Sequence, residues 1–191
     1  YEDNNYNQSY AGQATHDFNI NPQDQYVAHQ LGEYNTEHHT SYVKLRAELT
    51  DKVKNTTTGY FNYFTRDWFK LDKIVVGGTE YGDEVFNSIA ATGDQYTARL
   101  VAKGETAGQL RYKNNDRKYG AYGLMNETDF DFNTDILSKD VNHQLKIGFK
   151  YHYDYHNRFQ QKHNFTQAVG GAVTAHADGV TQSDDRHEKT H

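Results

Sequence analysis

Hydrophobic and polar residues alternate along residues 143–155, H-Q-L-K-I-G-F-K-Y-H-Y-D-Y. Odd positions from Leu145 to Tyr155 are apolar or aromatic, whereas the even positions carry Gln, Lys, Gly, His and Asp. A period of two places successive side chains on opposite faces, so this stretch predicts a β-strand with one apolar face. About 13 residues at ~3.3 Å each reach roughly 43 Å, well beyond the typical 5 or 6 residues. Such a strand is typical of the wall of an outer-membrane β-barrel.

Three further stretches predict strands of the same kind. Residues 43–49 alternate between aliphatic and charged side chains, Asp51 and Lys52 predict a short turn, and residues 56–70 return as a β-branched and aromatic strand. Residues 119–133 form another expected strand, which a turn over 134–141 joins to the strand at 143–155. The apolar face should carry Gly59, Phe61, Tyr63, Thr65, Tyr122, Leu124, Phe130 and Phe132, and the polar face Asn62, Arg66, Met125, Glu127, Asp129 and Asp131.

The remaining stretches show no sustained period. We expect long loops over residues 1–38 and 71–118, with a short helix at 84–91, and an irregular stretch after residue 157. The short turns then lie at one end of the sheet and connections of about thirty residues or more at the other. Outer-membrane barrels have short periplasmic turns and long extracellular loops, so Tyr151, Tyr153 and Tyr155 are expected at or above the outer interface. The predicted fold class is all-β, with about four long antiparallel strands of a larger transmembrane barrel.

Composition is compatible with this fold. The mean hydropathy is -1.02 and 35% of residues are hydrophobic, and no run approaches the ~18 apolar residues of a membrane helix. A barrel strand presents only every second residue to lipid, so a polar average does not exclude it. The absence of Cys excludes a disulfide framework and a thiolate site. The net charge of -6 argues against nucleic acid as a partner.

The sequence starts at Tyr1 without an initiator Met or a signal peptide. Four strands are too few to close a barrel, since closure requires at least about eight. We therefore expect residues 1–191 to be part of a barrel domain.

Two motifs suggest metal chemistry. His187, Glu188 and His191 spell H-E-K-T-H, the zincin pattern, which requires a helix to place both histidines on one face. The stretch D-D-R-H-E-K-T-H has no apolar face to pack such a helix, so we expect no metal site there. Eight other histidines lie mostly in predicted outer segments, where solvated side chains are the simpler expectation: His16, His29, His38, His39, His152, His156, His163 and His176. Glu127, Asp129 and Asp131 recur at period two, which favours a charged ladder over a catalytic pair.

Arg66, Arg117 and Arg158 lie where the predicted strands leave the membrane. A guanidinium group forms bidentate hydrogen bonds to carboxylates, so these arginines are the candidate substrate-binding residues for an anionic ligand. The competing interpretation is that they pair with nearby acids, namely Asp67, Asp116 and Asp154.

Four blocks of sequence resemble TonB-dependent outer-membrane receptors of the ferric citrate type. The first is N-Q-S-Y-A-G-Q-A-T-H-D-F-N-I-N-P-Q-D-Q-Y at residues 7–26, similar to the family's S-N-E-T-Y-L-G-L-T-x-x-D-F-x-x-N-P-x-x-R-Y loop. Residues 60–71, 114–119 and 143–160 follow in the family's order. Gln8 and Gln25 depart from the family, which usually has Glu and Arg there. The resemblance implies that the N-terminal plug and the TonB box are absent from this chain, together with most barrel strands.

These observations lead to one expected function and two alternatives. The expected function is part of an outer-membrane receptor of a Gram-negative bacterium that binds and imports a ferric siderophore or ferric citrate. Its partners would be outer-membrane lipid and TonB, acting through the plug, and no catalysis or resident cofactor is expected. One alternative is a soluble or surface haem-binding β-barrel that grips iron through His and Tyr. The other is an extracellular β-sheet adhesion module.

Overall fold

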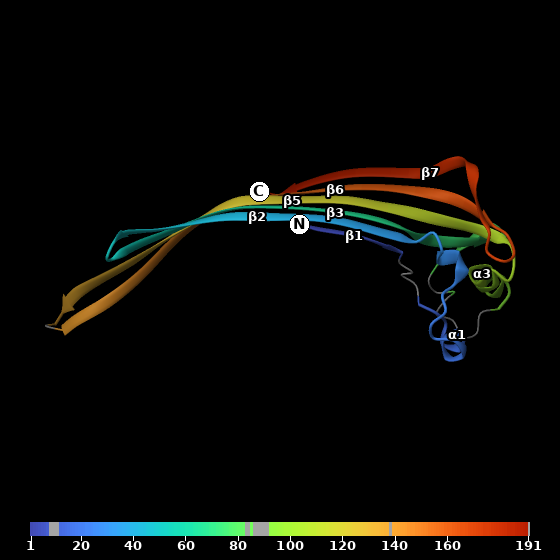
Figure 1. Ribbon diagram of the computed structural model, residues 1–191, viewed down its shortest axis with the longest axis horizontal. Helices are drawn as coiled ribbons and strands as arrows, with labels where there is room; N and C mark the ends of the chain where they lie inside the picture. The colour runs from blue at the N-terminus through green and yellow to red at the C-terminus, as the bar shows by residue number, and fades with distance from the viewer. Residues whose placement is uncertain (8–11, 83–84, 86–91, 138, 191) are drawn as a thin grey trace.

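A single curved antiparallel sheet, curled as a half-barrel, dominates the computed structural model (Figure 1). The structure describes residues 1–191 except 8–11, 83–84, 86–91, 138 and 191. The strands are β1 (Glu2–Asn7), β2 (Glu33–Thr50), β3 (Val53–Val76), β4 (Thr79–Tyr81), β5 (Gly108–Ile136), β6 (Lys139–Gln167) and β7 (Val173–Thr190). Their order is β1-β2-β3-β5-β6-β7, and β4 pairs with β3. The all-β prediction is confirmed.

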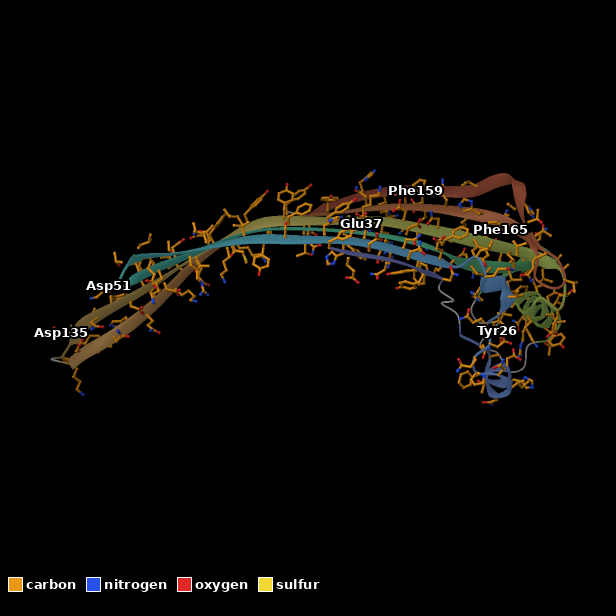
Figure 2. The ribbon with its side chains drawn as sticks, viewed as in Figure 1. Tyr26, Glu37, Asp51, Asp135, Phe159 and Phe165 are labelled. Atoms are coloured by element: carbon orange, nitrogen blue, oxygen red, sulfur yellow. The ribbon has the colours of Figure 1, made fainter. Side chains whose placement is uncertain are left out.

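Short helices gather at one end of the sheet, opposite the turns at Asp51 and Asp135 (Figure 2). They are α1 (Thr15–Ile20), the 3-10 helix η1 (Val27–His29) and α3 (Asp94–Lys103). Within the described ranges, no helix has the length and apolar character needed to cross a membrane.

The strands extend much further than the hydrophobic pattern predicted. β5 and β6 are each 29 residues long and β3 is 24. Three expected loops are therefore wrong in part: residues 1–38 contain β1 and the start of β2, residues 71–118 contain strand ends, β4 and α3, and residues after 157 contain the rest of β6 and all of β7. Backbone pairing continues there although the side chains are polar, because ladder hydrogen bonds do not depend on an apolar face.

The connections agree with the prediction at one end only. β2 and β3 join through the expected turn at Asp51 and Lys52, and the turn expected over 134–141 is tighter, because β5 reaches Ile136 and β6 begins at Lys139. At the helical end, residues 77–107 form the long connection, but β6 and β7 are joined by residues 168–172 alone. The helix expected at 84–91 lies outside the described residues apart from Val85.

The register confirms the predicted facing of the strands. β5 pairs with β6 without a shift from Gly108↔Gln167 to Ile136↔Lys139. Directly opposed residues share a face, so the apolar positions of β2, β3, β5 and β6 form one surface. We call this surface the apolar face; its exposed members are Val43, Leu45, Phe61, Tyr122, Leu124, Leu145, Ile147, Phe149 and Tyr151. The opposite surface, which carries Lys44, Glu127 and Lys150, we call the polar face.

The apolar face is bare over much of its length. Ile147 is 55% exposed and Phe149 64%, whereas Thr128 and Asn126, which lie opposite them on β5, are half-buried. Gly120 leaves space on this face for the ring of Tyr155, because a Cβ there would lie 2.2 Å from that ring. The apolar side chains are not continuous across the sheet, because Asn55 and Thr57 of β3 and Asn126 and Thr128 of β5 lie on the same face, in hydrogen-bonded pairs. The exposed apolar residues of β6 indicate a binding partner or a lipid environment.

At the helical end, the same face is covered by a small core. Leu71, Ile74, Leu110 and Tyr112 of the sheet pack against the helical cap, which we define as residues 14–31 and 94–104. Ala98, Val101 and Ala102 recur at helical spacing and are fully buried. Gly108 permits this approach, since a Cβ there would lie 2.5 Å from the side chain of Val101. The core thus fixes the cap to the apolar face and leaves the polar face uncovered by it.

A buried carboxylate holds the cap together. Asp17 accepts hydrogen bonds from the hydroxyl of Tyr26 at 2.7 Å and from Nη2 of Arg99 at 2.9 Å. The Tyr26 hydroxyl also accepts the backbone N–H of Ala14 at 2.9 Å. Burial opposes ionisation of Asp17, but the hydrogen bonds from Tyr26 and Arg99 outweigh it and lower the pKa to about 2.

This lowered pKa predicts that acid weakens the cap. Ionised Asp17 contributes stability above about pH 4, the value for an unfolded Asp, and that contribution is lost as the pH falls through about 2. In the wild type, the free energy of unfolding should therefore fall by about 2 kcal/mol between pH 5 and pH 2 because of Asp17, and Asp17→Asn should remove this fall. Urea unfolding at pH 5, 3 and 2 measures it. The exposed Asp24→Asn is the control and should keep the wild-type profile. An unchanged profile in Asp17→Asn would contradict the assignment.

Candidate anion-binding site

Four arginines lie side by side across the polar face. Arg66 of β3 is opposite Arg117 of β5, Arg117 is opposite Arg158 of β6, and Arg158 is opposite Arg186 of β7. We call these four residues the arginine row. Adjacent strands are about 4.8 Å apart, so the row extends across roughly 14 Å of the sheet.

The structure therefore brings together all three arginines that the sequence singled out. They are far apart in the chain, and only the strand register aligns them. Arg186 was missed because residues after 157 were expected to be irregular, and no local pattern marks it. A strand that included Arg186 could have been predicted from alternating apolar and polar residues over 173–190, but that stretch is mostly polar and shows no such alternation.

Few contacts within the protein neutralise the row. Arg158 donates from Nη2 to Asp184 Oδ2 at 2.7 Å and to Gln160 Oε1 at 2.6 Å. Arg117 Nη1 reaches the hydroxyl of Tyr119 at 3.4 Å, and the Arg66 guanidinium lies 5.9 Å from the ring centre of Trp68. Among the described residues, the buried Nε atoms of Arg66, Arg117 and Arg158 have no hydrogen-bond partner.

The acids expected to pair with the arginines do not do so. Asp67 and Asp116 are opposite each other, and both lie one residue away from an arginine, on the other face. Burial and the charges of Asp116 and Glu33 raise the pKa of Asp67. Asp154 lies 3.8 Å from His152, and the carboxylate beside Arg158 is Asp184. The competing interpretation is therefore wrong for the three named acids.

Aromatic rings border the arginine row on its turn side. The rings of His38 and Phe64 are 5.7 Å apart, those of Phe64 and Tyr119 are 5.9 Å apart, and Tyr119 stacks on His156 at 4.5 Å. On the cap side, Trp68 packs edge-on against Tyr34. These rings lower the local polarity beside the row, which strengthens charge-assisted hydrogen bonds made by the arginines.

Towards the tight turns, the polar face carries balanced charge. Lys146 lies 2.8 Å from Glu127 and 3.3 Å from Asp129, so two carboxylates of the predicted ladder are paired, while the third, Asp131, lies opposite Gln144. Hollows of about 330 and 360 Å³ lie on this part of the polar face, both beside Lys44, Thr56 and Glu127. Opposite charges pair at this end, whereas arginines face arginines nearer the cap.

The histidines of the described chain do not gather into a group of metal ligands. His187 and Glu188 belong to β7, so the helix that the zincin pattern needs is absent from that part of the described chain, and His191 lies outside it. Of the nine other histidines, His38 and His156 border the arginine row, and His152 is hydrogen-bonded to the Tyr60 hydroxyl. No group of three or more metal-ligating side chains forms among the described residues.

Comparison with models of known protein families gives no match, and comparison with curated proteins gives none either. The site is therefore described by its own chemistry, which is a row of four guanidinium groups on the polar face of a sheet.

Repulsion within the arginine row gives a direct test. Like charges directly opposed on a sheet cost roughly 0.2 to 1 kcal/mol per pair, and Arg117 takes part in two such pairs. Arg117→Gln should raise the free energy of unfolding in low salt, and the gain should shrink in 1 M salt, where charges are screened.

Lys150→Gln is the matched control, because Lys150 lies on the same face opposite the uncharged Met125. It should leave stability unchanged in urea titrations at both salt concentrations. If Arg117→Gln instead lowered the free energy of unfolding at low salt, Arg117 would make favourable contacts within the protein that outweigh the repulsion between arginines, which would contradict this prediction.

Proposed function

We propose that this chain forms part of the β-barrel of a TonB-dependent outer-membrane receptor that binds and imports a ferric siderophore of the ferric citrate type. The observation that carries the proposal is the contrast between the two faces of one sheet. One face presents exposed apolar residues, and the other presents an arginine row. The four blocks of sequence resemblance support the same family.

Lipid is the partner that best suits the apolar face. Apolar residues recur along β6 from Leu145 to Tyr155, about the 9–11 residues that a tilted membrane strand needs. The band ends in Tyr151, Tyr153 and Tyr155, and aromatic girdles flank the apolar band of such barrels. In water this exposed surface would favour aggregation, whereas lipid would cover it.

The connections suggest an orientation. In outer-membrane barrels the short turns are periplasmic and the longer connections are extracellular. The tight turns at Asp51 and Leu137 would then lie on the periplasmic side. The helical cap, the 77–107 connection and the arginine row would lie on the outer side, where a ligand arrives.

The arginine row would face the barrel lumen. A ferric complex of citrate or another carboxylate siderophore is anionic, and guanidinium groups bind carboxylates in a bidentate manner. The uncovered polar face and the single carboxylate contact of the described row, Asp184 with Arg158, support ligand binding there. In such a receptor, transport would depend on TonB and a plug domain, and the described strands would supply wall and binding surface.

The membrane part of the proposal predicts different effects for adjacent residues of β6. Phe149→Arg would place a charge in lipid, at a cost of about 2 to 4 kcal/mol near the midplane, and should reduce the amount of receptor assembled in the outer membrane. Lys150→Gln lies on the opposite face and should assemble normally. Heat-modifiable mobility in gels measures assembly, and equal assembly of both variants would contradict a lipid-facing apolar face.

The ligand part predicts a loss of binding without a loss of assembly. Changing Arg66 and Arg158 together to Gln should weaken ferric citrate binding well over tenfold, since each charge-assisted bond contributes about 1.5 to 3 kcal/mol. Uptake of radioactive iron and binding to the purified receptor are the measurements, with a neutral ferric siderophore as the control ligand. Unchanged affinity for the anionic chelate would refute the role of the arginine row.

A further inference from the structure

Two lysines on the polar face, nearer the tight turns than the arginine row, have no carboxylate partner. Lys146 forms ion pairs with Glu127 and Asp129 on this part of the sheet. Lys44 of β2 and Lys150 of β6 are exposed on the same face, and neither forms an ion pair within the described part of the chain. Their charges are therefore available to an anion from outside the protein.

Both lysines line one hollow of about 330 Å³. Lys44 is opposite Thr58, Thr58 is opposite Met125, and Met125 is opposite Lys150, so these four residues form one row across four strands. Gly148, two residues from Lys150 on the same face, also lines the hollow and leaves space there because it has no side chain. Ligand pockets in proteins have volumes of roughly 300 to 1,000 Å³, so the hollow is large enough for a small molecule.

The groups that line the hollow favour an anionic ligand. Two ammonium groups contribute point charges with three donors each, and the hydroxyls of Thr56 and Thr58 can donate hydrogen bonds as well. Glu127 is the one carboxylate among the lining residues, and its charge is neutralised by Lys146 at 2.8 Å. Carboxylates are ligands that suit this set of donors.

The hollow is separate from the arginine row. Lys150 precedes Arg158 by eight residues along β6, which is about 27 Å at 3.4 Å per residue. Eight is an even number, so both sites lie on the polar face. Between them, the hydroxyl of Tyr60 and Nδ1 of His152 are hydrogen-bonded at 2.5 Å across the sheet. A compact anion therefore occupies one site at a time.

We propose that this hollow is a second binding site for the anionic ligand, a small polycarboxylate, which Lys44 and Lys150 hold by charge and Thr58 by hydrogen bonds. This inference rests on the proposed function. With the tight turns on the periplasmic side, an imported anion reaches the hollow after it leaves the arginine row. Because both lysines are exposed, salt screens their charges and binding is weak. Weak binding suits a site that a transported ligand enters and then leaves.

Titration calorimetry with citrate tests the charge of this site, with the protein purified in detergent at low salt. The background is a triple arginine variant, in which Arg66→Gln, Arg117→Gln and Arg158→Gln are combined, so that the remaining binding comes from the hollow. Adding Lys44→Gln should weaken this remaining binding about tenfold or more, the loss of one charge-assisted contact. Triethyl citrate, the neutral ester, should not bind.

A second variant tests the shape of the site without changing its charge. Gly148→Leu should fill the hollow and weaken citrate at least tenfold in the same background. The strand accommodates a side chain there, because the nearest atom to an added Cβ is the backbone oxygen of Asn126 at 3.4 Å. Gly59→Leu is the matched control, since Gly59 lies on the apolar face with open space around it, and it should leave citrate binding unchanged.

The possible results distinguish this inference from the proposed function. Remaining binding that both Lys44→Gln and Gly148→Leu weaken supports the second site. If the triple arginine variant binds no citrate, the second site is refuted and the arginine row stands. Remaining binding that neither added substitution weakens also refutes the hollow. If the arginine substitutions leave affinity unchanged and Lys44→Gln removes binding, the hollow is supported and the proposed role of the arginine row is refuted.

Discussion

The unbroken pairing of β5 with β6 is the constraint on which the other features depend. From Gly108↔Gln167 to Ile136↔Lys139 the register never shifts, so each side chain of this hairpin keeps one face along 29 residues. A slip of one residue would move every apolar side chain to the polar face. The same pairing aligns Arg117 with Arg158, and the neighbouring β3 and β7 add the rest of the row. The apolar surface and the cationic surface are therefore two consequences of one register.

Alternation within a strand was predictable from the sequence, but alignment between strands was not. Apolar and polar residues alternate without interruption over residues 143–155, and the two sets lie on opposite faces of the sheet as predicted. Beyond Asn157 only Phe159 and Phe165 of β6 are apolar, so no period of two is visible in the sequence although the ladder continues to Gln167. The position of Arg186 opposite Arg158 depends on the 168–172 connection and on bulges in the β6–β7 pairing, neither of which a local pattern shows. The cap helix α3 was missed because residues 71–118 were treated as one irregular stretch.

Charge is arranged differently along the same polar face. Near the tight turns, Lys146 forms ion pairs with Glu127 and Asp129, so these charges are neutralised within the protein. Nearer the cap, like charges face one another across strands, which costs stability in the absence of a ligand. Destabilising arrangements of this kind, in which like charges face one another, are expected at functional sites. The cap packs on the other face, through Leu110 and Tyr112, so it stabilises this region without covering the arginines.

Spin labelling along β6 tests most directly whether the two faces meet different environments. The chain has no Cys, so single substitutions from Leu145→Cys to Tyr151→Cys each provide one labelling site. In the protein reconstituted into bilayers, labels at odd positions should be relaxed by oxygen, which concentrates in lipid, and labels at even positions by a water-soluble nickel chelate. The account predicts this alternation with a period of two. Accessibility without alternation, or with the nickel chelate reaching the odd positions, would contradict it.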